Sequence, residues 1–314
     1  MYNKASILFF SLILLGLLFL MSPRVEGKTI PESWVFSTVH IENLSTKKGG
    51  TGFLVSRKIS KDSFKIFLIS SKHLLKPKPL EGKEGEQKEA EAQIFLNRVE
   101  GDQIYLHKFN IVIRDKEGNN LWRGHPNEEI DVAAYDITNY ISKDRKLLPY
   151  LKLGFIREER FITKQELKER FVSVGDDAIM LGYPLNLVEE DYCFPIARHA
   201  VIATKPDYNF RKLPIFLIDS TTIRGSSGSP VFLPVLPYKW EEKNKVNTLS
   251  LTQSGLIGIV SGLIPDWQIT IEKTITFGAK PQKINIVNTA NLGIVYRTEV
   301  ISETLDTFGI LAYK

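Results

Sequence analysis

The amino-acid sequence predicts an all-β protein, and three observations lead to this prediction. Short segments rich in Val, Ile, Phe and Tyr recur along the chain, each about as long as one strand. Some of them are almost continuously apolar, as at residues 66–69, which is typical of a buried strand. Few helical segments separate them, so βαβ units with a parallel sheet are not expected. The expected architecture is therefore a β-sandwich or a β-barrel.

The expected strands lie between turn-forming residues. They are at residues 34–41, 52–56, 64–70, 93–97, 104–114, 132–136, 178–181, 201–204, 215–219, 255–260 and 292–297. Two helices interrupt them: Thr163 and Glu166 have the spacing of a capping box that continues to residue 171, and 298–307 is the second. Segments 76–92 and 239–245 are polar, so we expect solvated loops there.

Composition limits the kind of protein and the kind of site. The chain has 314 residues, 43% hydrophobic and 25% charged, which is typical of one large or two small globular domains. The single cysteine, Cys193, excludes an intramolecular disulfide, and its aromatic neighbours predict a core or strand residue rather than a nucleophile. Cys and His are too few and too scattered for a structural zinc cluster, so no metal and no cofactor are expected. The net charge of +5 comes from mixed charges, which argues against nucleic-acid binding.

The first 27 residues have the features of an export segment. Lys4 provides a positive charge, residues 5–21 form an apolar run, and Pro23 ends it. Small residues before position 28 predict a signal peptide that is cleaved after Gly27. The alternative is an uncleaved membrane anchor, although the run is short for a span of about 20 residues. In either case the remaining chain is expected outside the cytoplasm, as a secreted, periplasmic or membrane-anchored protein.

A histidine and an acid occupy positions that suit nucleophilic catalysis. His73 follows an apolar segment, and a strand end would hold its ring rigidly beside a cleft. Asp131 begins the apolar segment 131–134, where a carboxylate could fix the tautomer of a histidine base and stabilise its cation. Asp136 and Glu129 are alternatives for this acid. A purely structural role is the alternative for each residue taken alone.

The most specific signal is the Gly-Ser-Ser-Gly-Ser-Pro-Val sequence at 225–231. Gly225 would let its N–H turn inward beside that of Ser227, and two such donors form an oxyanion hole. A simple loop is the alternative. An α/β-hydrolase elbow is not expected, because its pattern needs glycine at position 229, where this chain has Ser229. The hydrolase order of serine, acid, histidine is also absent.

Four segments resemble, in the same order, the signature blocks of chymotrypsin/trypsin-like serine peptidases. They are GTGFLV at 50–55, LISSKH at 68–73, DVA at 131–133 and GSSGSPV at 225–231. GYP at 182–184 and GIVSG at 258–262 resemble two further blocks. The resemblance covers nearly the whole chain after the export segment and is closest to the cysteine-poor bacterial, Htr-like branch. We expect no PDZ domain after it.

The resemblance implies two antiparallel six-stranded β-barrels with the active site in the cleft between them. After the signal peptide or anchor at 1–27, it divides the chain into an N-terminal barrel at 28–150, a linker with a short helix at 151–177, and a C-terminal barrel at 178–314. The N-terminal barrel would carry the histidine and the aspartate, and the C-terminal barrel the serine.

The resemblance also implies roles for single residues. His73 would be the general base, Asp131 its orienting partner and Ser227 the nucleophile, with the backbone N–H groups of Gly225 and Ser227 as the oxyanion hole. A substrate-binding strand is implied as well, and it would pair with an extended peptide by β-augmentation. Its residues are Ser261, Gly262 and Leu263.

Departures from the family pattern bear on regulation and specificity. Ser226 stands where animal members have the aspartate that receives a newly cut N-terminus, so activation by that route is not expected. Lys72 and Ser229 replace small residues of the blocks without removing a reacting group. Thr221 falls near the base of the primary specificity pocket and is uncharged, which argues against a preference for Lys or Arg. Together with Leu263 it indicates small or medium apolar side chains.

The expected function is that of an exported serine endopeptidase that works through an acyl-enzyme. Two alternatives remain: a catalytically silent domain that binds peptides or proteins, and an esterase or acyl transferase that uses the same site. The expected partner is a protein or peptide substrate, with no nucleic acid. Membrane contact is expected only if the N-terminal segment is not cleaved.

Overall fold

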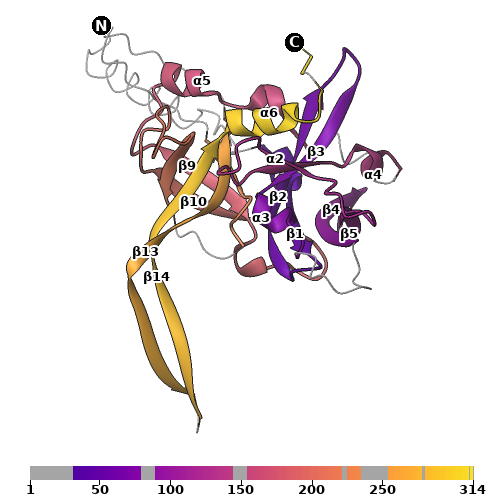
Figure 1. The fold of residues 1–314 in the computed structure, drawn as a ribbon. Coiled ribbons are helices and arrows are strands. Elements are labelled where there is room, and N and C mark those ends of the chain that lie inside the picture. Colours follow the sequence, from indigo (N-terminus) through magenta and orange to yellow (C-terminus); the bar gives the residue numbers. More distant parts are fainter. Residues whose placement is uncertain are drawn as a thin grey trace, which may run out of the picture.

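The chain folds into two β-sheets that lie side by side, with short helices around them (Figure 1). The computed structural model describes residues 31–78, 89–143, 154–220, 225–234, 254–277, 280–310 and 312–313, and for residues 263–290 it describes the backbone alone. The predicted all-β fold is confirmed. The expected export segment and the loop at 239–245 lie outside the described residues. In the part of the chain that is described, no helix is long and apolar enough to cross a membrane.

The N-terminal sheet has eight strands, of which β6 and β8 are only two residues long. Its hydrogen-bonded order is β5-β4-β1-β2-β3-β7-β6, and β8 joins β2 as the one parallel neighbour. The strands are β1 (Thr38–Asn43), β2 (Lys48–Lys58), β3 (Phe64–Ser70), β4 (Ala90–Glu100), β5 (Gln103–Arg114), β6 (Arg123–Gly124), β7 (Ala133–Asp136) and β8 (Ile156–Arg157). Residues 90–92, expected at the end of a loop, already belong to β4.

The C-terminal sheet closes into a barrel in the order β10-β11-β14-β13-β12-β9. Its strands are β9 (Asp177–Gly182), β10 (Ile196–Ile202), β11 (Ile215–Asp219), β12 (Pro230–Leu233), β13 (Gly255–Phe277) and β14 (Lys280–Arg297). Closure removes the unpaired strand edges that an open sheet would present to solvent. The barrel confirms the prediction of a six-stranded C-terminal unit.

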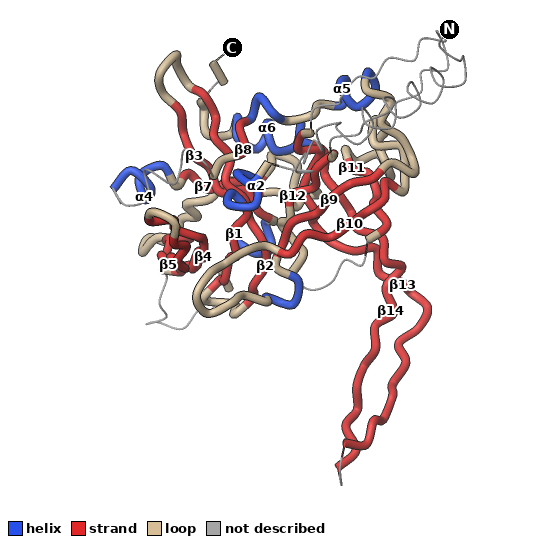
Figure 2. Tube along the Cα trace, turned by 180° about the vertical axis from the view of Figure 1, so that it is seen from behind, coloured by secondary structure: helices blue, strands red, loops and turns tan. Residues whose placement is uncertain are grey.

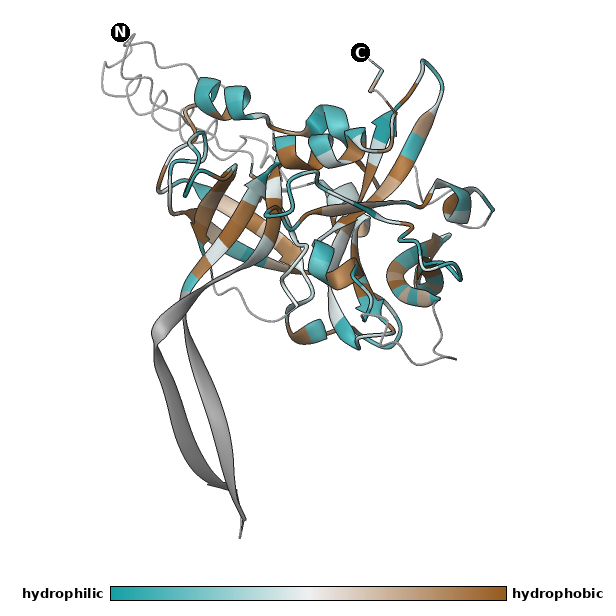
Figure 3. Cartoon of the chain, in the orientation of Figure 1, coloured by the Kyte–Doolittle hydropathy of each residue, from teal (hydrophilic) through white to brown (hydrophobic). Residues whose placement is uncertain are grey.

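Strand β3 is buried on both faces, which explains why its sequence is almost continuously apolar. Phe67 and Ile69 belong to the hydrophobic core between the two sheets. Ile66 and Leu68, on the opposite face, belong to the core inside the N-terminal sheet. Because successive strand residues point to opposite faces, one short strand serves both cores. Figure 3 shows that hydrophobic residues concentrate on the strands, whereas α5 and the connecting loops are hydrophilic.

The helices are short. They are α2 (Glu32–Ser37), α3 (Lys72–Leu75), α4 (Thr138–Lys143), α5 (Lys164–Glu169) and α6 (Thr298–Asp306), with 3-10 turns η2 (Glu158–Arg160) and η3 (Pro184–Asn186). Helices α2 and α6 contribute side chains to the core between the two sheets. The predicted capping box is confirmed: the Thr163 hydroxyl accepts from the Glu166 N–H, and the Glu166 carboxylate accepts from the Thr163 N–H. The predicted C-terminal helix is also confirmed, as α6.

The prediction of one strand over residues 34–41 is wrong at its start, where α2 forms. The hydroxyls of Ser37 and Thr38 both donate to the Trp34 carbonyl, at 2.9 Å each, and close this helical turn. The turn directs the Trp34 ring into the core, where it stacks on Phe232 of the barrel with ring centroids 4.4 Å apart. Tertiary packing of one aromatic ring therefore outweighs the strand propensity of Val35 and its neighbours.

Strands β13 and β14 continue beyond the barrel as a two-stranded arm that projects away from both sheets (Figures 1 and 2). Their pairing is regular between Thr270↔Val287 and Phe277↔Lys280, and it shifts register between Pro265 and Thr270. Only the barrel ends of these strands were expected from the sequence. Residues 269–277 alternate between apolar and polar types except at Lys273, and this alternation was the available signal for the longer strand.

A small buried cluster connects the N-terminal sheet to the segment that follows β9. Its members are Phe95, Tyr183 and Cys193, and the His40 ring packs edge-on against the first two. Burial raises the pKa of the Cys193 thiol, and the side chain is 1% exposed. Cys193 is therefore a core residue, as predicted, although it lies in an irregular segment rather than in a strand.

His40 is expected to make stability depend on pH. Burial lowers the pKa of His40 from 6.5 to about 4, and the nearby Asn186 side chain opposes this shift only in part. Between pH 6.5 and about pH 4 the His40 ring is therefore protonated in the unfolded chain but stays neutral in the folded chain. The free energy of unfolding should fall by about 3 kcal/mol across this window.

Urea unfolding at several pH values measures this effect. The His40→Phe variant should lose most of the pH dependence between these limits, because a neutral ring replaces the titrating one. His199 is exposed and supplies the control, since His199→Phe should leave the dependence in place. Equal pH profiles for wild type and His40→Phe would contradict the assignment.

Candidate active site

His73 and Asp131 meet because they extend from neighbouring strand ends. Strand β3 pairs antiparallel with β7, and the register places Ser70 opposite Ala133. The chain leaves β3 and turns into α3, which carries His73, while Asp131 lies just before β7. Antiparallel pairing puts the exit of one strand beside the entry of the other, so the two side chains lie together.

The Asp131 carboxylate accepts three hydrogen bonds. Its Oδ1 accepts from the His73 backbone N–H at 3.0 Å, and its Oδ2 lies 2.6 Å from His73 Nδ1 and accepts from the Ser261 hydroxyl at 2.8 Å. A carboxylate only accepts, so Nδ1 carries the ring proton. In the neutral ring Nε2 is then the free acceptor, which is the state that a general base requires.

Of the two alternative acids, Asp136 has a carboxylate that is engaged elsewhere, whereas the hydrogen bonds described for Glu129 are those of its backbone. Asp136 forms an ion pair with Lys65 at 2.7 Å and accepts from the Thr138 N–H at 3.0 Å. The backbone carbonyl of Glu129 accepts from the Tyr296 hydroxyl. Among the three acids proposed from the sequence, the structure joins Asp131 to His73.

Ser227 lies on a turn that is tied by backbone bonds to both sheets. Its carbonyl accepts from the Thr51 N–H at 2.9 Å, and the following N–H, of Gly228, donates to the Val260 carbonyl at 2.7 Å. At Gly50 an added Cβ would meet both the Leu74 side chain and the Ser227 carbonyl, so the turn lies beside the end of α3. No hydrogen bond joins the Ser227 hydroxyl to His73 within the described residues.

Gly225 has a conformation and a setting that only glycine suits. Its φ is +92°, and a Cβ there would lie 2.2 Å from the Tyr183 carbonyl oxygen. The Gly225 carbonyl accepts from the Thr51 hydroxyl at 2.9 Å, which fixes the direction of the peptide that follows. Within the described residues, the N–H groups of Gly225 and Ser227 have no protein acceptor.

Thr51 was missed as a site residue from the sequence, and it holds the turn from inside. Its side chain is fully buried and its hydroxyl accepts from the Tyr183 N–H at 3.0 Å while donating to Gly225. Its carbonyl accepts from the Ser70 hydroxyl at 2.7 Å. Thr51 of β2 is therefore bonded to three other segments, at Ser70, Tyr183 and Gly225. The available signal was its place in the GTGFLV block at 50–55.

The expected substrate-binding residues are described only in part. Ser261 directs its hydroxyl to Asp131, a contact that was not predicted. Gly262 is half-buried, and nothing lies within 4 Å of the place a Cβ would take. Thr221 and the Leu263 side chain lie outside the described residues. No group of three or more His, Cys, Asp or Glu side chains suited to a metal occurs in the part of the chain that is described.

The fold and this site define an all-β protein with a histidine–aspartate pair beside a Gly-Ser turn. No protein-family model and no curated protein sequence match the chain. Similar solved structures include Deg5, with 14% identity over 74% of this chain and 81% of that chain at a TM-score of 0.40. The structure of HBP is 10% identical, covers 90% of this chain and 95% of its own, and has a TM-score of 0.42. Human heparin binding protein is 9% identical, covers 90% of this chain and 95% of its own, and has a TM-score of 0.40.

Proposed function

We propose that the chain is an exported serine endopeptidase that uses His73, Asp131 and Ser227. The hydrogen bonds from His73 to Asp131, at 3.0 and 2.6 Å, carry this proposal, because they orient the ring and leave Nε2 as a base. The two N–H donors of the 225–227 turn support it. Export is proposed from the signal-peptide pattern of residues 1–27.

The proposed reaction starts with attack of the Ser227 hydroxyl on the carbonyl carbon of a peptide bond. His73 Nε2 takes the hydroxyl proton, and Asp131 stabilises the imidazolium that forms. The N–H groups of Gly225 and Ser227 donate to the oxyanion of the tetrahedral intermediate, at about 3 kcal/mol for each donor. His73 then protonates the leaving amine, and water hydrolyses the acyl-enzyme by the same steps.

Labelling with a fluorophosphonate probe tests the nucleophile. We expect the mature protein to be labelled with one probe per chain, and Ser227→Ala to remove the label because the attacking oxygen is lost. The neighbouring Ser226→Ala and Ser229→Ala variants serve as controls, since both hydroxyls are buried and should not react. A folded wild-type protein that takes up no label would contradict the proposal and favour a silent peptide-binding domain.

A peptide library with the same protein separates the remaining possibilities. An endopeptidase should cleave internal peptide bonds, with a proposed preference for small or medium apolar residues before the cut, based on Thr221 and Leu263. An esterase would take up the probe and hydrolyse activated esters but leave the library intact. The two activities share the tetrahedral intermediate, so probe labelling alone does not distinguish them.

A further inference from the structure

The loop that carries Asp131 is held from a distant part of the chain. It leaves β6 at His125 and returns to β7 through Asp131, and the His125 N–H donates to the Val132 carbonyl at 3.0 Å. The Asn127 carbonyl accepts from the Ile130 N–H at 3.1 Å, and the Asn127 side chain accepts from the Glu129 N–H at 3.0 Å. Asn127 therefore sets the turn that leads to Asp131.

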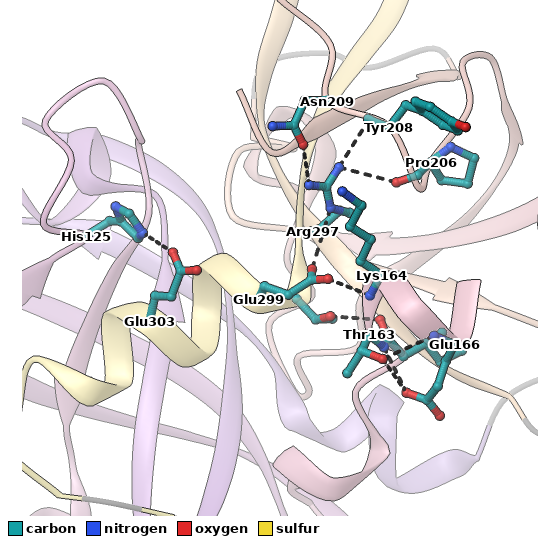
Figure 4. A network of polar contacts seen from close by, with 12 residues as sticks. His125, Thr163, Lys164, Glu166, Pro206, Tyr208, Asn209, Arg297, Glu299 and Glu303 are labelled. Atoms are coloured by element: carbon teal, nitrogen blue, oxygen red, sulfur yellow. Dashed lines mark hydrogen bonds and ion pairs between the residues drawn. The ribbon is translucent and has the colours of Figure 1, made fainter. Parts of the chain in front are cut away.

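His125 connects this turn to the C-terminal helix. Its Nε2 lies 2.7 Å from the Glu303 carboxylate of α6, as Figure 4 shows, and its Nδ1 lies 3.0 Å from the backbone N of Asn127. Because a backbone N–H only donates, Nδ1 is the acceptor and Nε2 carries the proton. One ring thus accepts from the turn and donates to the helix, and only 7% of it is exposed.

Both ends of this connection are anchored. On the same helix, Val300, Ile301 and Leu305 are fully buried in the core between the sheets, so the helix cannot shift without opening that core. At the other end, Lys72, the residue before His73, lies 3.4 Å from both the Asn127 carbonyl and the Glu128 carboxylate. The turn is therefore held between α6 and the helix that carries His73.

We propose that His125, held by Glu303, is a positioning residue for Asp131, so that the C-terminal helix sets the geometry of the His73–Asp131 pair. The inference rests on the proposed peptidase function for its kinetic consequence. His125 touches neither substrate nor reacting atoms. Loss of its ring would free the Asn127 N–H and let the turn relax, which would move the Asp131 carboxylate relative to His73 Nδ1.

The central experiment compares His125→Phe with wild type in two readouts. The phenylalanine ring is similar in size, so it keeps the packing, but it loses the hydrogen bonds to Glu303 and to the Asn127 N–H. The kcat for a cleaved peptide should fall about 10- to 100-fold with KM changed less than about threefold, since positioning affects the transition state more than ground-state binding. The downfield proton NMR signal of the His73 Nδ1–H, which requires no turnover, should weaken or shift.

Glu303 supplies a second test that does not disturb the loop, since its side chain is 58% exposed. Glu303→Gln keeps an acceptor for Nε2–H and should retain most of the wild-type rate. Glu303→Leu has no acceptor, so its kcat should fall as in His125→Phe. His199→Phe is the matched control, because it removes an exposed His–Asp pair, 2.8 Å long, in the barrel.

The possible outcomes distinguish a failure of the peptidase proposal from a failure of the positioning role of His125. If wild type neither cleaves peptides nor takes up the probe, the peptidase proposal fails, and the NMR signal still decides the role of His125. An unchanged His73 signal and wild-type kcat in both His125→Phe and Glu303→Leu would overturn the positioning role. An equal loss in Glu303→Gln and Glu303→Leu would overturn the role of the His125–Glu303 bond.

Discussion

Under the proposed peptidase function, replacing Asp131 with Asn is expected to lower kcat by about four orders of magnitude with little change in KM. The amide oxygen of the new side chain would still accept from the His73 backbone N–H. The amide NH₂ group, however, would face Nδ1 and make that nitrogen an acceptor, so the ring proton moves to Nε2. His73 would then present a donor to Ser227 and could not take its proton.

Steady-state kinetics on a cleaved peptide measure this loss, and thermal unfolding shows whether the variant is folded. Asp177→Asn is the matched control, because Asp177 also pairs with a histidine, His199, at 2.8 Å but lies exposed on the barrel. We expect that control to keep the wild-type rate. A loss of less than about tenfold in Asp131→Asn would show that Asp131 does not orient the base.

Replacing Glu158 with Gln is expected to cost about 3–5 kcal/mol of unfolding free energy, which is a large part of the stability of a typical domain. The Arg57 guanidinium is 1% exposed and forms two bonds of 2.8 Å with the Glu158 carboxylate. It also reaches Asp306 at 2.7 Å and the Ile310 carbonyl at 2.8 Å. Without Glu158 a buried cation loses one of its two carboxylate partners, and the one that remains, Asp306, is 56% exposed.

Urea unfolding measures the effect of this network, which ties β2 to η2 and to the end of α6. The adjacent Glu159 is exposed, so Glu159→Gln should change stability by less than about 0.5 kcal/mol. The double variant Arg57→Met with Glu158→Leu should be more stable than Glu158→Gln, because it leaves no buried charge uncompensated. If Glu158→Gln matched the Glu159→Gln control, the network would have no stabilising role.

The sequence predicted most strands because their signals are local. Strands β3 and β11 have the bounds that their apolar segments indicated, and α5 begins at its capping box. The start of the strand expected at 34–41 was wrong because α2 depends on a ring from another sheet, Phe232, which no local pattern contains. The arm of β13 and β14 was missed although its pairing is local, from Phe277↔Lys280 to Thr270↔Val287, because Lys273 interrupts the alternation that would have indicated it.

In the candidate site, too, some features could be predicted from the sequence and others depend on the folded chain. Residue type and position made His73, Asp131 and Ser227 candidates, and the family resemblance implied their roles. Strand register explains why the first two meet. The sequence left Asp131, Asp136 and Glu129 as candidates for the acid, and only the hydrogen bonds of the folded chain distinguish them.

By itself, the sequence determined the all-β class and the residue types of the candidate site, because strand propensity and glycine-rich turns act over a few neighbouring residues. The tertiary structure alone decided which acid meets His73, that Thr51 supports the 225–227 turn, and that His125 and Glu303 connect α6 to the Asp131 loop. These contacts join residues 58, 174 and 178 positions apart. Hydrogen bonds of that span follow from strand register within the N-terminal sheet and from how the two sheets and α6 pack, which no local sequence pattern specifies.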